Sequence, residues 1–335
     1  MKNNPLISVV LPTYNVAQYL QQCLESVAAQ TYRNIEVIII IDGATDGSYE
    51  IAQEFCKKDN RFAVYWQENA GSGPARNAGL AHCQGEYVMF VDPDDWIEPE
   101  LLEKLYEAQQ EGDYDLVASR RIIAQCDQRG KVIKIIPRHY AEETIMGQQQ
   151  VRLAFMRMLR EAVVSAPTQK LYKMSIIRAH QVEFPSLRRS QDIVFNHRYY
   201  NHIHSLALIA YSGYYYRQFV KQSIGKVEAD YYKTIVLLYN DYRSLYQKWN
   251  LSFPKQEMAE WFFRVRIYSY LQKMVGRKQD FTEAAGDPTI RMIVQTAQPK
   301  TFYLRLTRRF LLSESYKSLR WLLTVILKMK QTHIK

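Results

Sequence analysis

The chain has 335 residues, 47% of them hydrophobic, which is enough to fill one large domain and a smaller appendage. Its 44 Lys and Arg against 34 Asp and Glu give a formal net charge of +10. Nine of the basic residues lie between Lys300 and Lys335, where Glu314 is the one acidic residue. The body of the chain is therefore close to neutral, and the basic tail leaves nucleic acid, an anionic membrane or a polyphosphate substrate to be considered.

The cysteines, at positions 23, 56, 83 and 126, show no C-x-x-C spacing, so neither a disulfide framework nor a zinc knuckle is indicated. The first apolar run, residues 7–12, is too short for the core of a signal peptide. No segment approaches the roughly 18 uninterrupted apolar residues of a membrane-spanning helix. These features predict a cytoplasmic protein.

Short β-rich runs alternate with helical patterns through the first third of the chain. The predicted strands are residues 7–11, 35–41, 62–66, 87–91 and 116–119, and the predicted helices are residues 16–29, 48–57, 75–83 and 99–111. Such alternation predicts an α/β fold with a mostly parallel, Rossmann-like sheet.

The pattern loosens between residues 120 and 215 and becomes helical after residue 221. The looser part contains a strand-like run at 131–136, a helix at 148–160 and a Tyr-rich strand at 206–216. The helical part contains residues 230–249 and 258–275 and ends in a basic, apolar helix near 315–329. We expect one α/β domain, residues 1–225, followed by a helical region, residues 226–335.

Ligands of open parallel sheets bind at the carboxyl ends of the strands, so the loops after each strand carry the information about function. The first strand ends in Pro12-Thr13-Tyr14-Asn15, where Asn15 can cap the next helix and Tyr14 offers an aromatic face. The second ends at Asp42, a carboxylate able to accept from a base or sugar hydroxyl, and Asp46 is expected to be a helix cap.

Two further loops carry charge. Arg76 follows a Gly-rich loop and is expected in a first helical turn, where a guanidinium and backbone N–H groups can face a diphosphate. This loop lacks the G-x-G-x-x-G pattern of a dehydrogenase. Asp92, Asp94 and Asp95 follow a buried-looking strand, and a hard divalent cation relieves the repulsion between carboxylates so close together.

Four stretches together resemble the inverting GT-A glycosyltransferases of bacterial polysaccharide and lipopolysaccharide assembly, the glycosyltransferase family 2 type. They are residues 7–15, 36–48, 75–79 and 85–96, which stand in the order and spacing of that family. The resemblance implies the nucleotide-diphospho-sugar transferase fold, with residues 1–120 binding the nucleotide sugar and 121–225 the acceptor. One departure is Ile41, where such enzymes usually carry an acid before Asp42.

The resemblance also implies roles for individual residues. The donor, expected to be a UDP-sugar, would be bound by Pro12, Thr13, Tyr14, Asp42, Arg76, Asp92 and Asp94. A Mg or Mn ion would be held by Asp94 and Asp92, with Asp95 able to share that role. Inversion needs a carboxylate that takes the proton of the acceptor hydroxyl, and Asp192 is the candidate. Further acceptor-side candidates are Trp96, Lys170, Tyr172 and Gln191.

The expected activity is transfer of a hexosyl or N-acetylhexosaminyl group onto a saccharide or lipid-linked glycan of a capsule, lipooligosaccharide or other surface polysaccharide. Two alternatives stay open: a nucleotidyltransferase that makes the sugar nucleotide, and a non-enzymatic basic protein that binds membrane or nucleic acid. The acidic cluster and aliphatic tail disfavour nucleic acid as a partner. The segment 300–335 is expected either to contact the anionic inner face of the cytoplasmic membrane or to pack on the domain.

Overall fold

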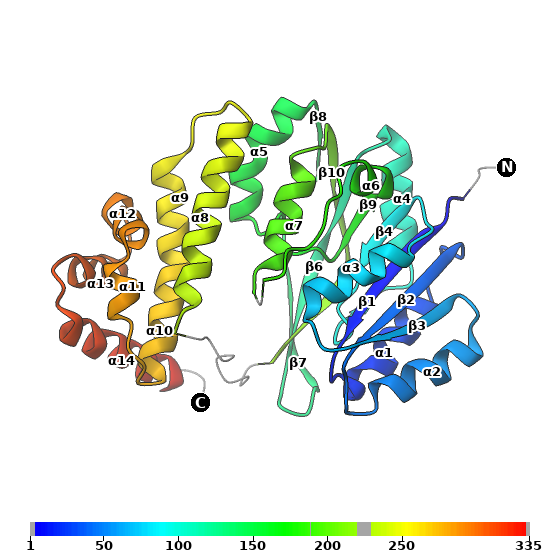
Figure 1. Cartoon of the computed structure of the whole chain (residues 1–335), viewed down its shortest axis with the longest axis horizontal. Helices are drawn as coiled ribbons and strands as arrows, with labels where there is room; N and C mark the ends of the chain where they lie inside the picture. The colour runs from blue at the N-terminus through cyan, green and yellow to red at the C-terminus, as the bar shows by residue number, and fades with distance from the viewer. Residues whose placement is uncertain (1–3, 188, 220–228, 333–335) are drawn as a thin grey trace. The chain divides into compact units, whose positions relative to one another are not determined.

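A computed structural model of the chain describes residues 4–187, 189–219 and 229–332. It divides into two compact units, Met1–Lys221 and Gln222–Lys335. The first unit contains the β-sheet, and every element that the structure describes in the second unit is a helix (Figure 1). The strand-end loops singled out in the sequence all belong to the first unit.

The amino-terminal half of the sheet is parallel, in the order β3-β2-β1-β4. Its strands are β1 Ile7–Thr13, β2 Ile35–Asp42, β3 Phe62–Gln67 and β4 Tyr87–Phe90. The helices between them are α1 Ala17–Ala28, α2 Ser48–Lys58 and α3 Ser72–His82. Neighbouring residues such as Ile39 and Ile40 in β2 are both buried, because helices cover both faces of the sheet.

The sheet continues as β4-β9-β6-β10-β5, with β7 paired to β6 and β8 paired to β10. These strands are β5 Trp96–Ile97, β6 Leu116–Cys126, β7 Val132–Pro137, β8 Glu143–Met146, β9 Lys170–Lys173 and β10 Ser205–Phe219. Strands β6 and β10 are parallel, whereas β5, β7, β8 and β9 pair antiparallel. The predicted α/β fold is confirmed, and its sheet is mixed.

Four helices complete the first unit: α4 Leu101–Gly112, α5 Gln148–Arg160, α6 Met174–Ala179 and α7 Gln191–Tyr200. The short strand β5 pairs with the far end of the long strand β10, where Ile97 lies opposite Tyr214 and Trp96 opposite Tyr215. This pairing joins residues more than a hundred positions apart, and it brings β10 against the acidic cluster that precedes β5.

The second unit is built around aromatic side chains. Its helices are α8 Tyr231–Lys248, α9 Lys255–Trp261, the π-helix Phe262–Ile267, α10 Tyr268–Gly276, α11 Thr282–Gly286, α12 Pro288–Thr296, α13 Phe302–Leu312 and α14 Tyr316–Thr332. The buried ring of Phe262 packs edge-on against Tyr239 and Tyr242, with centroids 5.2 and 5.7 Å apart.

The basic helix α14 packs within this unit. Leu319 and Leu323 are fully buried, and the helix lies against α10 and α13. Arg320 donates to the Gln279 carbonyl and lies over the Phe281 ring, whereas Trp321 is 69% exposed. Among the described residues, no helix has both the length and the apolar character needed to cross a bilayer.

Candidate active site

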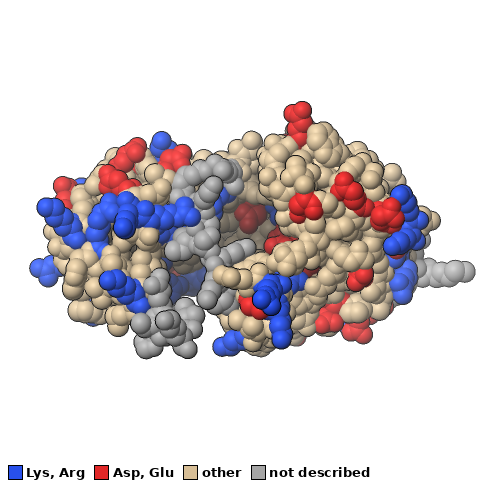
Figure 2. Space-filling model, turned by 90° about the horizontal axis from the view of Figure 1, so that it is seen from below, with Lys and Arg blue, Asp and Glu red and all other residues tan. Residues whose placement is uncertain are grey.

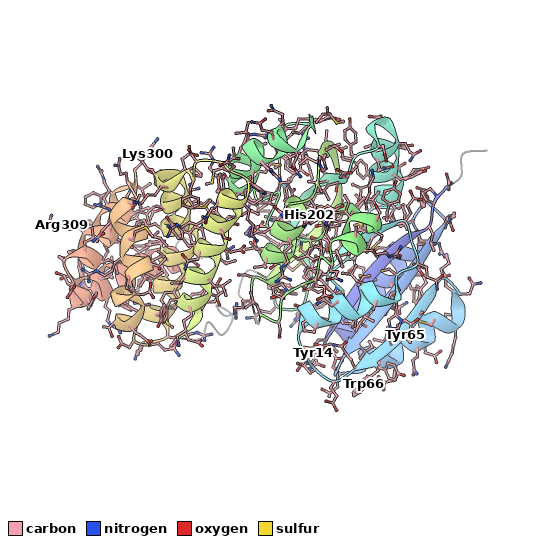
Figure 3. All side chains as sticks on the ribbon, turned by 45° about the horizontal axis from the view of Figure 1, so that its top comes forward. Tyr14, Tyr65, Trp66, His202, Lys300 and Arg309 are labelled. Atoms are coloured by element: carbon pink, nitrogen blue, oxygen red, sulfur yellow. The ribbon has the colours of Figure 1, made fainter. Side chains whose placement is uncertain are left out.

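The carboxyl ends of β1, β2 and β3 lie in register, because Thr13 pairs with Ile41 and Ile41 pairs with Trp66. Pro12 and Thr13 are buried, whereas Tyr14 is 51% exposed. Trp66, which the sequence pattern had not singled out, is 56% exposed at the same end of the sheet, and Figure 3 labels both aromatic residues. Two aromatic faces are therefore available beside the strand ends.

Asp42 is buried and organises a loop. Its Oδ1 accepts from the Gln67 amide at 2.7 Å and from the Ala70 N–H at 2.8 Å, and its Oδ2 accepts from the Gly71 N–H at 2.8 Å. The neighbouring Gly43 has φ +68°, and a Cβ there would lie 2.8 Å from a backbone nitrogen. Three of the roughly four acceptor positions of this carboxylate are therefore occupied, and the remaining one is on Oδ2.

Asp46 is a helix cap, as predicted, and it caps two helices at once. Its Oδ2 accepts from the Ala17 N–H at the start of α1, and its Oδ1 accepts from the Ser48 N–H at the start of α2. The expectation that Asn15 caps α1 is wrong. Asn15 accepts instead from the Thr45 N–H at 2.8 Å, so it holds the β1 and β2 loops together.

Arg76 and Asp92 form a salt bridge, with Nη2 2.6 Å from Oδ1. Arg76 lies in the second turn of α3, because the helix begins at Ser72 and not at Ala75. Its guanidinium is 5.4 Å from the centroid of the Phe184 ring, and its buried Nε–H has no partner among the described residues. An unpaired buried donor is costly, and an added phosphate oxygen would satisfy it.

The three aspartates after β4 have different surroundings. Asp95 is buried, its Oδ2 accepts from the Tyr214 hydroxyl at 2.8 Å, and its Oδ1 accepts from the Arg217 N–H at 2.7 Å. Burial and the charge of Asp92 raise the pKa of Asp94 to about 6. No group of three His, Cys, Asp or Glu residues in the described chain is placed to hold a metal ion. Both carboxylate oxygens of Asp95 therefore bind β10, and Asp95 connects the acidic cluster, residues 92–95, to that strand.

Arg217 in β10, which the sequence analysis missed, holds this motif in place. Its Nε donates to the Asp94 carbonyl at 2.7 Å, Nη1 to the Gly130 carbonyl at 3.0 Å and Nη2 to Gln22 at 2.7 Å. The guanidinium lies 4.7 Å from the centroid of the Trp96 ring, which stacks on Tyr215. The density of aromatic residues in 206–216 was visible in the sequence, but the β5–β10 pairing was not.

Asp192 lies in the first turn of α7, and the preceding Gln191 connects that turn to the start of α3. The Gln191 amide donates to the Ser72 hydroxyl at the start of α3, and its side chain packs beside Gly73. Buried Tyr172 feels the charges of both Arg76 and Asp192, although burial itself is the main reason that its pKa is raised. Gln191 thus holds the start of α7, which carries Asp192, against the start of α3.

Two of the acceptor-side candidates, Lys170 and Tyr172, have fully buried side chains. The Tyr172 hydroxyl donates to Asn196 at 2.8 Å. The Lys170 ammonium donates to the Ala166 carbonyl at 2.6 Å, so it is not presented to an acceptor. Burial, with a smaller contribution from the charge of Arg121, lowers the pKa of Lys170 to about 7, and the charge of Asp192 acts in the opposite direction.

Comparison with known proteins assigns the family. Residues 8–173 match the model of glycosyl transferase family 2. The glycosyltransferase GlyG of Streptococcus pneumoniae serotype 4 is 34% identical over 215 residues, which are 64% of this chain and 71% of GlyG. This chain belongs to glycosyl transferase family 2. EpsH of Bacillus subtilis is 33% identical over 250 residues, which are 73% of this chain and 70% of EpsH.

Solved structures confirm the GT-A fold of this glycosyltransferase. Residues 1–349 of S. aureus TarS, crystallised with UDP, superpose with a TM-score of 0.63 at 19% identity, covering 96% of this chain and 91% of that one. The mannosyltransferase PcManGT from Pyrobaculum calidifontis, in complex with GDP-Man and Mn²⁺, gives 0.53 at 14% identity, covering 96% and 86%. At these identities the likeness is evidence for the fold.

Proposed function

We propose that this glycosyltransferase transfers a hexosyl or N-acetylhexosaminyl group, with inversion, from a UDP-sugar to a saccharide acceptor in bacterial surface polysaccharide, capsule or lipooligosaccharide synthesis. The observation that carries the proposal is the contact between the starts of α3 and α7, made by Gln191 and Ser72. We infer that this contact places the carboxylate of Asp192, in the first turn of α7, close to the Arg76–Asp92 salt bridge.

The donor side is proposed to lie over the ends of β1 to β3. Tyr14 would stack on the uracil, Asp42 would shape the pocket through the Ala70–Gly71 backbone, and Arg76 would offer its unpaired Nε–H to the diphosphate. TarS has been crystallised with UDP and with UDP-GlcNAc, which supports a uridine nucleotide here.

Asp92 and Asp94 fit a divalent cation. Both offer hard oxygen ligands, and burial together with the charge of Asp92 raises the pKa of Asp94 to about 6, an effect that a bound cation would oppose. We propose Mg or Mn, consistent with the Mn²⁺ in the PcManGT complex. A bound cation would neutralise charge on the departing diphosphate.

Asp192 is proposed as the general base. Its carboxylate takes the proton of the acceptor hydroxyl while that oxygen attacks the anomeric carbon from the face opposite the diphosphate. The bond from that carbon to the diphosphate breaks, and UDP leaves with the bonding electrons. Trp96 is proposed to contact the acceptor. It follows Asp95 directly, stacks on Tyr215 and is half-buried.

The second unit is proposed to act at the inner face of the cytoplasmic membrane. Trp321 is exposed on α14, between buried leucines that hold the helix to its own unit. Helix packing and a peripheral lipid contact are therefore compatible, because they use different faces of α14. The cytoplasmic location stays a prediction from the sequence.

The test is nucleotide release from a panel of sugar nucleotides with Mn²⁺, for the wild type, Asp94→Asn, Asp192→Asn and the matched control Glu111→Gln. Glu111 is an exposed acid on α4. We expect a UDP-sugar to be turned over, with about a hundredfold loss in Asp192→Asn and an undiminished UDP affinity. Asp94→Asn should lose metal-dependent UDP binding as well as rate.

Each role can fail separately. Equal rates for Asp192→Asn and wild type would remove Asp192 from the reaction. Nucleotide binding that is indifferent to divalent ions and to Asp94→Asn would remove the metal site. No binding of any sugar nucleotide would contradict the proposed donor class.

A further inference from the structure

Strand β7 exposes aliphatic side chains on both of its faces. Val132, Ile133 and Ile135 are 37, 57 and 45% exposed. In the described sheet β7 pairs with β6 alone, so its other edge is open. Single exposed aliphatic residues are ordinary, but three within four positions on an open edge form a patch that natural proteins normally avoid or use.

The chain segment that contains β7 is basic, and its one acidic side chain already accepts hydrogen bonds. Residues 121–141 contain five Lys and Arg against one acidic residue, Asp127. The Asp127 carboxylate accepts from the N–H groups of Arg129 and Lys131, so it serves the turn before β7. The exposed basic side chains around the patch are Arg129, Lys131, Lys134 and Arg138. Figure 2 shows basic and acidic side chains on the face seen from below in Figure 1.

The turn before β7 is fastened to the acidic motif. The Gly130 carbonyl accepts from Arg217, which also donates to the Asp94 carbonyl. Gln18 in α1 donates to the Arg129 carbonyl at 3.1 Å, and a Cβ at Gly130, where φ is +82°, would lie 2.8 Å from the Tyr19 ring. The patch is thus held in a fixed place relative to Asp94.

We propose that β7, which contains Lys134, docks the first unit on the surface of an anionic lipid bilayer, together with the flanking basic residues Arg129, Lys131 and Arg138. Exposed aliphatics flanked by Lys and Arg match an interface in which acyl chains lie beneath negative headgroups. The open backbone edge of β7 needs water or headgroup partners, so the strand would sit at headgroup level and not within the hydrocarbon.

A second copy of the chain is the less favoured occupant of this edge. Pairing two β7 strands edge to edge would bring Lys134, in the middle of the strand, and the flanking basic residues near their own counterparts. Like charges set close together across a strand pair are destabilising, and lysine in edge strands is a common device against such association. Anionic headgroups reverse the sign of that interaction.

This inference deepens the proposed function and rests on it for its consequence. Because Arg217 links the hairpin to Asp94, docking through β7 would hold the acidic motif at a fixed distance from the bilayer. An acceptor saccharide carried on a membrane lipid would then reach the site without leaving the membrane. Lipid docking itself can be measured without donor, metal or acceptor.

The experiment is co-sedimentation of the full chain with phosphatidylcholine vesicles with and without phosphatidylglycerol. The wild type should bind the anionic vesicles, and Ile133→Ser with Ile135→Ser should weaken that binding at least about tenfold. Lys131→Glu with Lys134→Glu should weaken binding to the anionic vesicles by at least a similar factor. The control, Met146→Ser with Leu153→Ser, removes equally exposed apolar side chains of the same unit and should bind as wild type.

Three results would overturn the proposal. The first is a wild type that ignores anionic vesicles, and the second is unchanged binding in both β7 variants together with lost binding in Trp321→Ser. The third is light scattering that shows a dimer which the β7 variants dissociate, with vesicle binding unaffected. UDP binding by the same variants, measured without vesicles, reports separately on the proposed activity and should match the wild type.

Discussion

At the scale of single residues, buried charged side chains of the first unit bind backbone groups and build the site indirectly. Asp42 accepts from N–H groups of the loop after β3, Arg217 donates to the Asp94 and Gly130 carbonyls, and Lys170 donates to the Ala166 carbonyl. From residue type alone, such charged side chains are expected to bind substrate or metal directly. Their burial and their partners give them the role of positioning residues.

Lys170 gives a prediction for stability against pH. Burial holds its pKa at about 7 in the folded protein, against 10.5 for an ordinary lysine. Between these values the unfolded chain binds more protons, so the free energy of unfolding should rise with pH, by at most about 1.4 kcal/mol per pH unit. Below pH 7 both states are protonated and this contribution is flat.

Urea unfolding from about pH 6 to about pH 9 tests this through the linkage slope. Lys170→Met keeps the side chain long and apolar, and its stability should fall relative to wild type as the pH rises above 7. The control Lys104→Met removes a partly exposed lysine of α4, paired with Glu107, and should follow the wild-type slope. Parallel curves for wild type and Lys170→Met would show that the buried amine does not titrate in this range.

At the scale of elements, the loops after β1, β2 and β4 are fixed to one another by side chains. Asp46 joins the starts of α1 and α2, Asn15 joins the first two loops, and the β5–β10 pairing brings Tyr214 and Arg217 to the acidic motif. Local patterns predicted the strands β1 to β4 and the helices α1 to α4 but could not show these connections, because the partners are distant in sequence.

Asp46→Ala should therefore destabilise two helices together. Each lost cap costs about 1 kcal/mol, so we expect a loss of roughly 2 kcal/mol in the free energy of unfolding. Asp46→Asn keeps an acceptor at the cap position and should lose clearly less. Chemical denaturation of the three proteins measures the difference, and equal losses for Ala and Asn would show that charge, not hydrogen bonding, matters at this position.

At the scale of the whole molecule, every residue proposed for donor, metal and base lies within the first unit. That unit also has its own core, which includes Ile39, Val37 and Leu24. The fragment 1–225 should fold and should bind UDP in the presence of Mn²⁺ with an affinity close to that of the full chain. Isothermal titration of both proteins measures this, with Asp94→Asn in the fragment as the negative control. A folded fragment without nucleotide binding would place part of the site in residues 226–335.

The sequence by itself determined the α/β class, the family and most element positions. Alternating apolar runs and strand-end motifs are local properties, and Asp42, Arg76, Asp92 and Asp94 stand in them at recognisable spacings. The sequence also predicted that Asp46 caps a helix. It did not predict that Asp46 caps α1 as well, because α1 lies upstream in the chain.

Only the tertiary structure decided which of these residues remain available. It buried Lys170 and Tyr172, engaged both oxygens of Asp95, and introduced Arg217 and the exposed edge β7. The physical reason is that burial and hydrogen-bond partners arise from strand pairings between segments such as β5 and β10, and residue types alone do not specify those pairings.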